Sequence, residues 1–267
     1  MEIELDGRAA YAYSGGKAFD AALPTVVFIH GAQNDHSVWG LQSRWFAHHG
    51  FGVLAVDLPG HGRSTGSPLP SIEDLADWIA ALILKVGAGA TAKNVTLIGH
   101  SMGSLTALEC AARHPARIAR VALVGTAVPM PVSDALLEAA KHKEPRAIAM
   151  INAWSHSPRA TIGGNTVPGI WLLGASRRLM ERQKPGVLHN DLAACNAYSG
   201  GIDAAAALAC PALVISGSKD MMTHPKAAAK LALAIRDAKN VLLDGAGHAL
   251  MAEQPDAVLD ALRRFVI

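Results

Sequence analysis

Residues 94–108 read NVTLIGHSMGSLTAL, and they carry the clearest indication of the fold. Its first six residues form a short run rich in Val, Leu and Ile, which predicts a strand buried on both faces of a parallel sheet. A helical pattern then follows, up to His114. Ser101 lies between the two in a G-x-S-x-G pattern, where Gly99 and Gly103 supply the small neighbours that a sharp strand–turn–helix connection needs. Ser101 is therefore the candidate nucleophile.

The same pattern recurs at residues 62–66, which read GRSTG. A pattern this short arises by chance in about one chain in ten of this length, so the surrounding elements have to decide between the two serines. Ser64 follows a loop and precedes Pro68 and Pro70, so no helix can start there. This context favours Ser101.

A serine hydroxyl needs a base to activate it and an acid to orient that base. Where the serine lies in such a turn, the acid and the base follow it in the chain in that order. Asp220 comes soon after the seventh expected strand, and His248 comes soon after the eighth. Both lie at the carboxyl ends of strands, on the sheet edge where Ser101 emerges. The competing acid, Asp244, is expected to end its own strand instead.

Attack by a serine creates an oxyanion, which two backbone N–H groups must stabilise. Met102 directly follows Ser101 and offers one of them. The loop after the strand expected at residues 25–30 offers the other, and Ala32 is the best candidate because Gly31 lets the chain turn tightly.

Strand-like and helix-like segments alternate along the chain. The first two strands flank Asp6-Gly7, which is typical of a hairpin, and a helical periodicity over residues 72–86 begins after a capping sequence at Ser71. The alternation predicts an α/β fold with a doubly wound, mostly parallel sheet of eight strands. These strands are expected at residues 2–5, 9–13, 25–30, 52–57, 94–99, 120–125, 211–216 and 240–244.

One region interrupts this alternation, because helical pieces and no clear strand are expected between residues 126 and 210. An insertion at the carboxyl end of a strand lies over the usual ligand crevice of such a sheet. We therefore expect a core of residues 1–125 and 211–267, and a helical cap insertion of residues 126–210. Three apolar side chains of the cap are candidates for the wall of a substrate pocket, namely Trp154, Trp171 and Met130.

Composition and charge exclude several classes of function. With 51% hydrophobic and 17% charged residues, the chain is not expected to be disordered. The 24 Lys and Arg against 22 Asp and Glu give a net charge of +2 and no basic stripe, so no nucleic-acid partner is expected. No apolar run approaches the roughly 18 residues of a membrane span, and the first residues lack the features of a signal peptide. We expect a cytoplasmic protein without a membrane partner.

No metal site or cofactor is indicated. His48 and His49 are adjacent, so their side chains point apart on a helix, and no His-Glu-x-x-His pattern occurs. The three cysteines show no CxxC spacing and are expected to be reduced and mostly buried. The oligomeric state stays open.

Taken together, these motifs resemble those of the α/β-hydrolase superfamily. They comprise His30-Gly31, residues 57–64 (DLPGHGRS), residues 99–103, Asp220 and Gly247-His248, and they span nearly the whole chain. The resemblance implies a catalytic triad of Ser101, Asp220 and His248, an oxyanion hole formed by Ala32 and Met102, and a lid between the sixth and seventh strands.

Within the superfamily, the chain is similar to serine hydrolases with a lid that cleave carboxylic esters of small molecules with water and no cofactor. Haloalkane dehalogenases and epoxide hydrolases use an Asp nucleophile, so Ser101 argues against both. Carbon–carbon bond hydrolases usually carry Gly-Pro-Gly after His-Gly, where this chain has Ala32-Gln33-Asn34. Carbon–carbon bond hydrolysis stays open as an alternative because it uses the same triad. Enol-lactonases, perhydrolases or haloperoxidases, acyltransferases and a non-catalytic ligand receptor also stay open.

Overall fold

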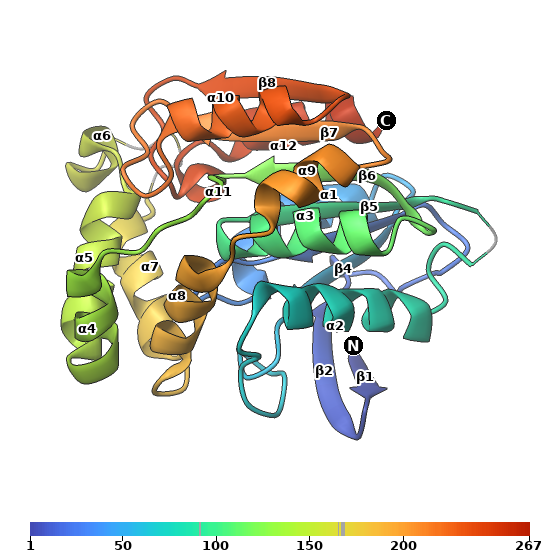
Figure 1. The fold of residues 1–267 in the computed structure, drawn as a ribbon, viewed down its shortest axis with the longest axis horizontal. Coiled ribbons are helices and arrows are strands. Elements are labelled where there is room, and N and C mark those ends of the chain that lie inside the picture. The colour runs from blue at the N-terminus through green and yellow to red at the C-terminus, as the bar shows by residue number, and fades with distance from the viewer. Residues whose placement is uncertain (91, 165, 167–168) are drawn as a thin grey trace.

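The computed structural model describes residues 1–90, 92–164, 166 and 169–267, and in it eight strands form one sheet between layers of helices (Figure 1). The spatial order is β1-β2-β4-β3-β5-β6-β7-β8. The first two strands run antiparallel to their neighbours and the others pair in parallel, so the predicted fold class is confirmed. The strands are β1 (Glu2–Leu5), β2 (Arg8–Tyr13), β3 (Thr25–Ile29), β4 (Gly52–Asp57), β5 (Val95–His100), β6 (Ile118–Val124), β7 (Ala212–Gly217) and β8 (Ala238–Leu243).

The central strands are continuous apolar runs because helices cover both of their faces. Along β3, Val27 and Ile29 belong to one hydrophobic cluster, and Val26 and Phe28 belong to the other. The first cluster includes residues of α2 (Ile72–Lys85), α3 (Met102–Arg113) and α10 (Pro225–Ala234), and the second includes residues of α1 (Gly40–Ala47), α11 (Leu250–Glu253) and α12 (Pro255–Val266). This alternation is what a doubly wound sheet requires.

The local signals in the sequence act as expected. Asp6 and Gly7 both have positive φ, 50° and 72°, which is the geometry of a tight hairpin turn. The Ser71 side chain accepts a hydrogen bond from the Asp74 N–H and so caps α2. Predicted strand bounds differ from the observed ones by at most two residues. The largest differences are at the starts of β8 (Ala238) and β6 (Ile118), where a register shift against β5 adds length.

The order of strands reverses between β3 and β5, since β4 lies on one side of β3 and β5 on the other. Ligands bind at such a switch point because the loops after the two strands part there and leave a crevice. Residues 31–35 follow β3, with a short 3₁₀ helix, η1 (His36–Trp39), behind them, and Ser101 follows β5. The predicted oxyanion loop and the predicted nucleophile therefore meet at the switch point.

Six helices and no strand are found in the described part of residues 126–210. They are α4 (Asp134–His142), α5 (Glu144–Ser155), α6 (Pro158–Thr161), α7 (Leu172–Glu181), α8 (Val187–Ala197) and α9 (Gly201–Ala207). Figure 1 shows α4 to α8 gathered at one end of the sheet. A separate apolar cluster packs α4, α5, α7 and α8 together, and it includes Leu136, Ile148, Met180 and Leu188. By contrast, α9 packs on α3 and α10 of the body. The division at residues 126 and 210 stays a prediction.

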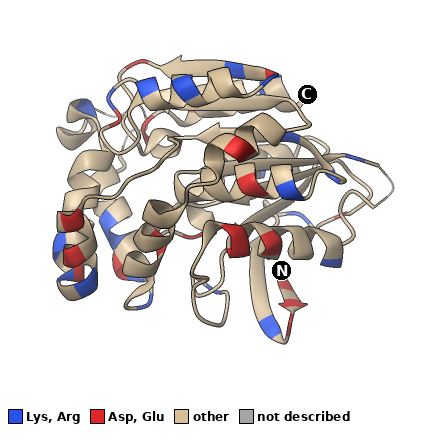
Figure 2. Cartoon of the chain, viewed as in Figure 1, with Lys and Arg blue, Asp and Glu red and all other residues tan. Residues whose placement is uncertain are grey.

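Charged side chains of both signs are mixed over the outer helices, as Figure 2 shows. Helix α4, for example, carries Asp134, Glu138 and Lys141. That no nucleic acid binds stays a prediction from the charge balance, and so does the cytoplasmic location. In the part of the chain that is described, none of the helices combines the length and the apolar composition of a membrane span.

Two imidazoles are fully buried at the carboxyl ends of the central strands. His30 follows β3, and burial, followed by the charge of His61, lowers its pKa to about 4. His100 is the last residue of β5, and burial, followed by the charge of His248, lowers its pKa to about 3. Both rings are therefore neutral in the folded protein over most of the acid range.

Acid should destabilise the protein through these two rings. The unfolded chain takes up a proton on each imidazole below about pH 6.5, whereas folded His100 does so only near pH 3. The free energy of unfolding should therefore fall as the pH drops through this window, by up to about 1.4 kcal/mol per pH unit for each such histidine. Urea titrations at pH values from about 6 to about 4 measure this free energy, and it should fall less steeply with decreasing pH in His100→Gln than in the parent protein. Parallel curves would contradict this expectation.

Candidate active site

Ser101 has a backbone conformation that few residues other than glycine adopt, with φ 53° and ψ −121°. Such a residue carries about 1–3 kcal/mol of strain, which the surrounding structure has to hold in place. The Ser101 N–H donates to the Val124 carbonyl (2.9 Å), and the Ser101 carbonyl accepts from the Ser104 N–H (2.8 Å) at the start of α3. The turn predicted from the sequence is present, and it presents the Ser101 side chain to a cavity.

The loop after β3 lies directly against this serine. A Cβ added to Gly31 would stand 3.0 Å from the Ser101 Cβ, so any larger residue would crowd the serine. The next residue, Ala32, lines the same cavity, and its N–H donates to no other described residue. Met102 is the first residue of α3, and N–H groups in the first turn of a helix have no partner within the helix. Of the two predicted oxyanion donors, Met102 thus directly follows Ser101, and Ala32 shares the cavity with it.

The predicted base and acid are in contact. The Nδ1 atom of His248 lies 2.8 Å from the Asp220 Oδ2 atom, and both side chains are buried. The same carboxylate accepts from the Thr223 hydroxyl (2.7 Å) and from the N–H groups of Met222 and Thr223 (2.8 Å each). Asp244 lies elsewhere and accepts a hydrogen bond from the Ser218 hydroxyl. Of the two acids weighed from the sequence, Asp220 is the one that holds His248.

These bonds decide the charge of Asp220. Burial alone would raise the pKa of its carboxyl group, but the charge and hydrogen bond of His248 and the hydrogen bonds of Thr223 outweigh burial and hold that pKa below its ordinary value. The group is therefore a carboxylate at neutral pH, and it accepts a hydrogen bond from the Nδ1–H group of His248. The side-chain hydrogen bonds of the His248 ring to described residues all involve Nδ1, and none involves Nε2.

A cavity of about 1010 Å³ lies between the sheet and the cap, and Ser101, His248 and Ala32 line it. Most of its other walls are apolar and come from both the cap and the body, including Met130, Leu136, Trp154, Met180, Leu192, Met221, Met222 and Met251. Its size and lining are typical of a site for a small molecule.

Two of the three pocket residues predicted from the sequence line this cavity, and the third does not. Met130 and Trp154 line it. Trp171 is 74% exposed and is not among the described residues that line the cavity, although its neighbours Ile170 and Leu172 are. Its ring lies instead over Gly174 of α7, where an added Cβ would stand 2.1 Å from the Trp171 Cε3 atom. Trp171 thus sits on the outside of the cap.

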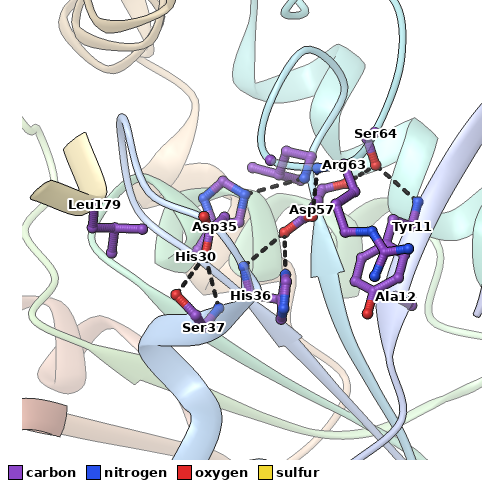
Figure 3. A network of polar contacts seen from close by, with 12 residues as sticks. Tyr11, Ala12, His30, Asp35, His36, Ser37, Asp57, Arg63, Ser64 and Leu179 are labelled. Carbon is purple, nitrogen blue, oxygen red and sulfur yellow. Dashed lines mark hydrogen bonds and ion pairs between the residues drawn. The ribbon is translucent and has the colours of Figure 1, made fainter. Parts of the chain in front are cut away.

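Ser64, the second serine in the sequence pattern, is buried and fully bonded. Its hydroxyl donates to the Asp57 carbonyl (2.6 Å) and accepts from the Tyr11 N–H (2.9 Å) (Figure 3). The Asp57 carboxylate in turn accepts from the N–H and the Nδ1 atom of His36, at 2.8 and 2.7 Å, and from the Arg63 N–H. This network ties strands β2 and β4 to η1, so Ser64 serves the fold.

One cluster of described residues has the side-chain types that bind metals, and it consists of Asp35, His36 and Asp57. Each offers one ligand atom, and these atoms lie within 4.8 Å of one another. Their polar atoms already make other bonds: Asp35 accepts from the Ser37 hydroxyl and from Arg182, and Asp57 accepts from His36. The cluster therefore holds loops of the protein together, and a metal would have to break these bonds.

Two buried carboxylates near the site escaped the sequence analysis. Asp191 of α8 bonds the loop after β3, and Glu253 of α11 accepts from the N–H groups of Gly247 (3.1 Å) and Ser157 (3.2 Å). The second carboxylate therefore joins the His248 loop to the cap. No sequence pattern indicates either residue, because their partners lie 6 to 158 positions away along the chain.

Comparisons with known proteins agree with this geometry. A 26% identical relative, the pimeloyl-[acyl-carrier protein] methyl ester esterase of Nitrosospira multiformis, matches over 260 residues, covering 91% of this chain and 94% of its own. Esterase Rv0045c of Mycobacterium tuberculosis is 25% identical, over 90% of this chain and 82% of its own. The enol-lactonase structure from Burkholderia xenovorans superposes with a TM-score of 0.86 at 26% identity, covering 100% of this chain and 99% of that one. The sequence pattern of the alpha/beta hydrolase family matches residues 26–261, and the chain therefore belongs to that family.

Proposed function

We propose that the protein is a serine hydrolase that cleaves a carboxylic ester of a small molecule through an acyl-enzyme on Ser101. The observation that carries this proposal is the strained Ser101 at the end of β5, which shares a cavity with a histidine held by Asp220. Two similar proteins named as esterases, one of them a methyl ester esterase, support the same chemistry.

The proposed reaction has two halves. In the first, the Ser101 hydroxyl attacks the ester carbonyl carbon while His248 Nε2 takes its proton, and the N–H groups of Ala32 and Met102 stabilise the oxyanion. The carbon–oxygen bond to the alcohol then breaks, and His248 returns the proton to the leaving oxygen. In the second half, a water oxygen attacks the acyl carbon while His248 takes a proton from the water. The bond between the acyl carbon and Ser101 Oγ then breaks, the proton returns to Ser101, and the acid leaves. No cofactor is needed, since water is the second substrate.

Lactone hydrolysis is the second candidate. A lactone is an ester within a ring, so the same residues would open it by the same steps. The observation that favours it is the superposition on an enol-lactonase along the whole chain. A panel of linear esters and lactones, compared by kcat/KM, separates the two substrates.

The two serines of the sequence pattern provide a matched pair of variants. Ser101→Ala should lower the hydrolysis of a p-nitrophenyl ester by about 10⁴–10⁶-fold, because the nucleophile is lost. Ser64→Ala should lower the free energy of unfolding, because two buried hydrogen bonds are lost, but should keep most of its activity per folded molecule. A serine-directed organophosphate should label Ser101 in both the parent protein and Ser64→Ala. An inactive Ser64→Ala together with an active Ser101→Ala would overturn the assignment.

The acids Asp220 and Asp244 give a second matched pair. Asp220→Asn should lower kcat by roughly 10⁴-fold, because the amide holds the wrong tautomer of His248. Asp244→Asn should leave kcat unchanged, since Asp244 bonds only the Ser218 hydroxyl by its side chain. Steady-state kinetics on the same ester measure both. Equal effects of the two substitutions would show that another group orients His248.

The cap tryptophans test the specificity of the cavity. Trp154→Ala removes part of the cavity wall and should change the preference among acyl chain lengths, at about 1–3 kcal/mol per methylene-sized step. Trp171→Ala is the control, because the exposed ring lies outside the cavity. Values of kcat/KM over a series of p-nitrophenyl esters measure the preference. A profile that moves with Trp171 and stays fixed with Trp154 would contradict the position of the pocket.

A further inference from the structure

One carboxylate oxygen of the cap joins two loops of the body. Oδ2 of Asp191, in α8, accepts the Gln33 N–H (2.9 Å) and lies 2.8 Å from the His61 Nε2 atom. Gln33 belongs to the loop after β3, and His61 belongs to the loop after β4. All three residues are at least 98% buried, with exposed fractions of 1% for Asp191, 0% for Gln33 and 1% for His61.

His61 acts as the cationic partner of Asp191. Its Nδ1 atom lies 3.0 Å from the Pro59 carbonyl oxygen, and its Nε2 atom faces the Asp191 carboxylate. Because both partners can only accept, each ring nitrogen has to carry a proton to form its hydrogen bond. Burial alone would lower the pKa of His61, but the charge and hydrogen bond of Asp191 outweigh burial and raise it. The buried carboxylate is therefore compensated by an ion pair.

The neighbouring His30 shows the opposite arrangement. Its Nδ1 atom donates to the Gly31 carbonyl (2.8 Å), and its Nε2 atom accepts from the Leu58 N–H (3.1 Å), which together require the neutral ring. The two imidazoles lie 4.9 Å apart between their centroids, one neutral and one charged. The pairing with Asp191 is thus specific to His61.

The Gln33 N–H is part of the peptide unit that follows Ala32. Gln33 has a positive φ of 56°, a conformation that costs about 1–3 kcal/mol and needs support from neighbouring groups. Besides the bond to Asp191, the Gln33 amide side chain donates to the Glu144 carboxylate (3.0 Å) and to the Met180 carbonyl (3.1 Å), both in the cap. The cap therefore fixes the residue next to the proposed oxyanion donor through three bonds.

We infer that Asp191 is a positioning residue for the oxyanion hole: by holding the Gln33 N–H and His61, it fixes the direction of the Ala32 N–H toward the reacting carbonyl. The inference rests on the proposed function. It gives the cap a part in the rate of the chemical step, besides its part in choosing the substrate.

The test is Asp191→Ala against Gln183→Ala. Gln183 is also a buried cap residue that bonds body loops, at Gly62 and Asp35, but none of its hydrogen bonds to described residues reaches Ala32 or Gln33, and it is not among the described residues that line the cavity. Asp191→Ala should lower kcat on a p-nitrophenyl ester by about 10²-fold with little change in KM, because a donor to the transition state is misplaced. Asp191→Asn keeps a neutral acceptor for the Gln33 N–H and should recover much of this loss. Gln183→Ala should keep kcat near the parent value.

A trifluoromethyl ketone separates positioning from general damage to the fold. Its adduct with Ser101 carries an oxyanion in the hole, whereas the corresponding alcohol binds the cavity without one. For Asp191→Ala, the affinity for the ketone should fall in step with kcat, while the affinity for the alcohol stays unchanged. Equal losses for ketone and alcohol, or a kcat no lower than that of Gln183→Ala, would overturn the inference.

Two further outcomes have fixed meanings. If Asp191→Ala does not fold, the double variant Asp191→Leu with His61→Leu takes its place. It removes both charges and the acceptor of the Gln33 N–H, and it leaves no buried ion unpaired. This variant should show the same selective loss of ketone affinity, and unchanged ketone affinity would overturn the inference. If the parent protein neither hydrolyses esters nor forms the Ser101 adduct, the proposed function is wrong and the inference falls with it.

Discussion

The contact on which the rest of the site depends is the approach of α3 to the end of β3. An added Cβ at Gly103 would lie 2.5 Å from the carbonyl oxygens of both Ile29 and His30, so the helix can start there only because Gly103 has no side chain. This approach puts the first turn of α3 beside the loop that follows β3. Ser101, with its positive φ, lies directly before this turn, and Gly31 of the loop lies close to the Ser101 Cβ. The proposed nucleophile and the proposed oxyanion loop therefore meet where the two backbones pack closely.

Partners, and not burial alone, decide the charge of the histidines around the site. His30 and His100 are buried against backbone groups, and the pKa of each is lowered. His61 is also buried but faces the carboxylate of Asp191, and its pKa is raised. A buried imidazole without an acid stays neutral, whereas one beside a carboxylate can carry a proton. The proposed mechanism needs a histidine that is oriented by a carboxylate, and His248 has such a partner in Asp220.

The sheet, its order of motifs and the contact between Asp220 and His248 could all be predicted from the sequence, because they follow from local patterns: apolar runs, a turn flanked by glycines, and loops at strand ends. The roles of Asp191 and Glu253 could not, because nothing near them in the chain sets them apart from surface acids. Side-chain direction in the cap was also beyond the sequence. Trp154 and Trp171 look alike as apolar residues of one insertion, yet one lines the cavity and the other lies 74% exposed over Gly174.

The bonds between cap and body bear on how this scaffold could be re-engineered. Exchanging caps between relatives is an obvious way to alter which substrates a hydrolase accepts. Here the foreign cap would have to bring an acceptor for the Gln33 N–H at the position of Asp191, and a carbonyl at the position of Ser155 for the Ala249 N–H beside His248. On the proposed roles, chimaeras joined without these groups would keep Ser101, Asp220 and His248 and still be slow. Junctions drawn inside the cap, leaving α8 and residues 155–157 with the host, would preserve both sets of bonds.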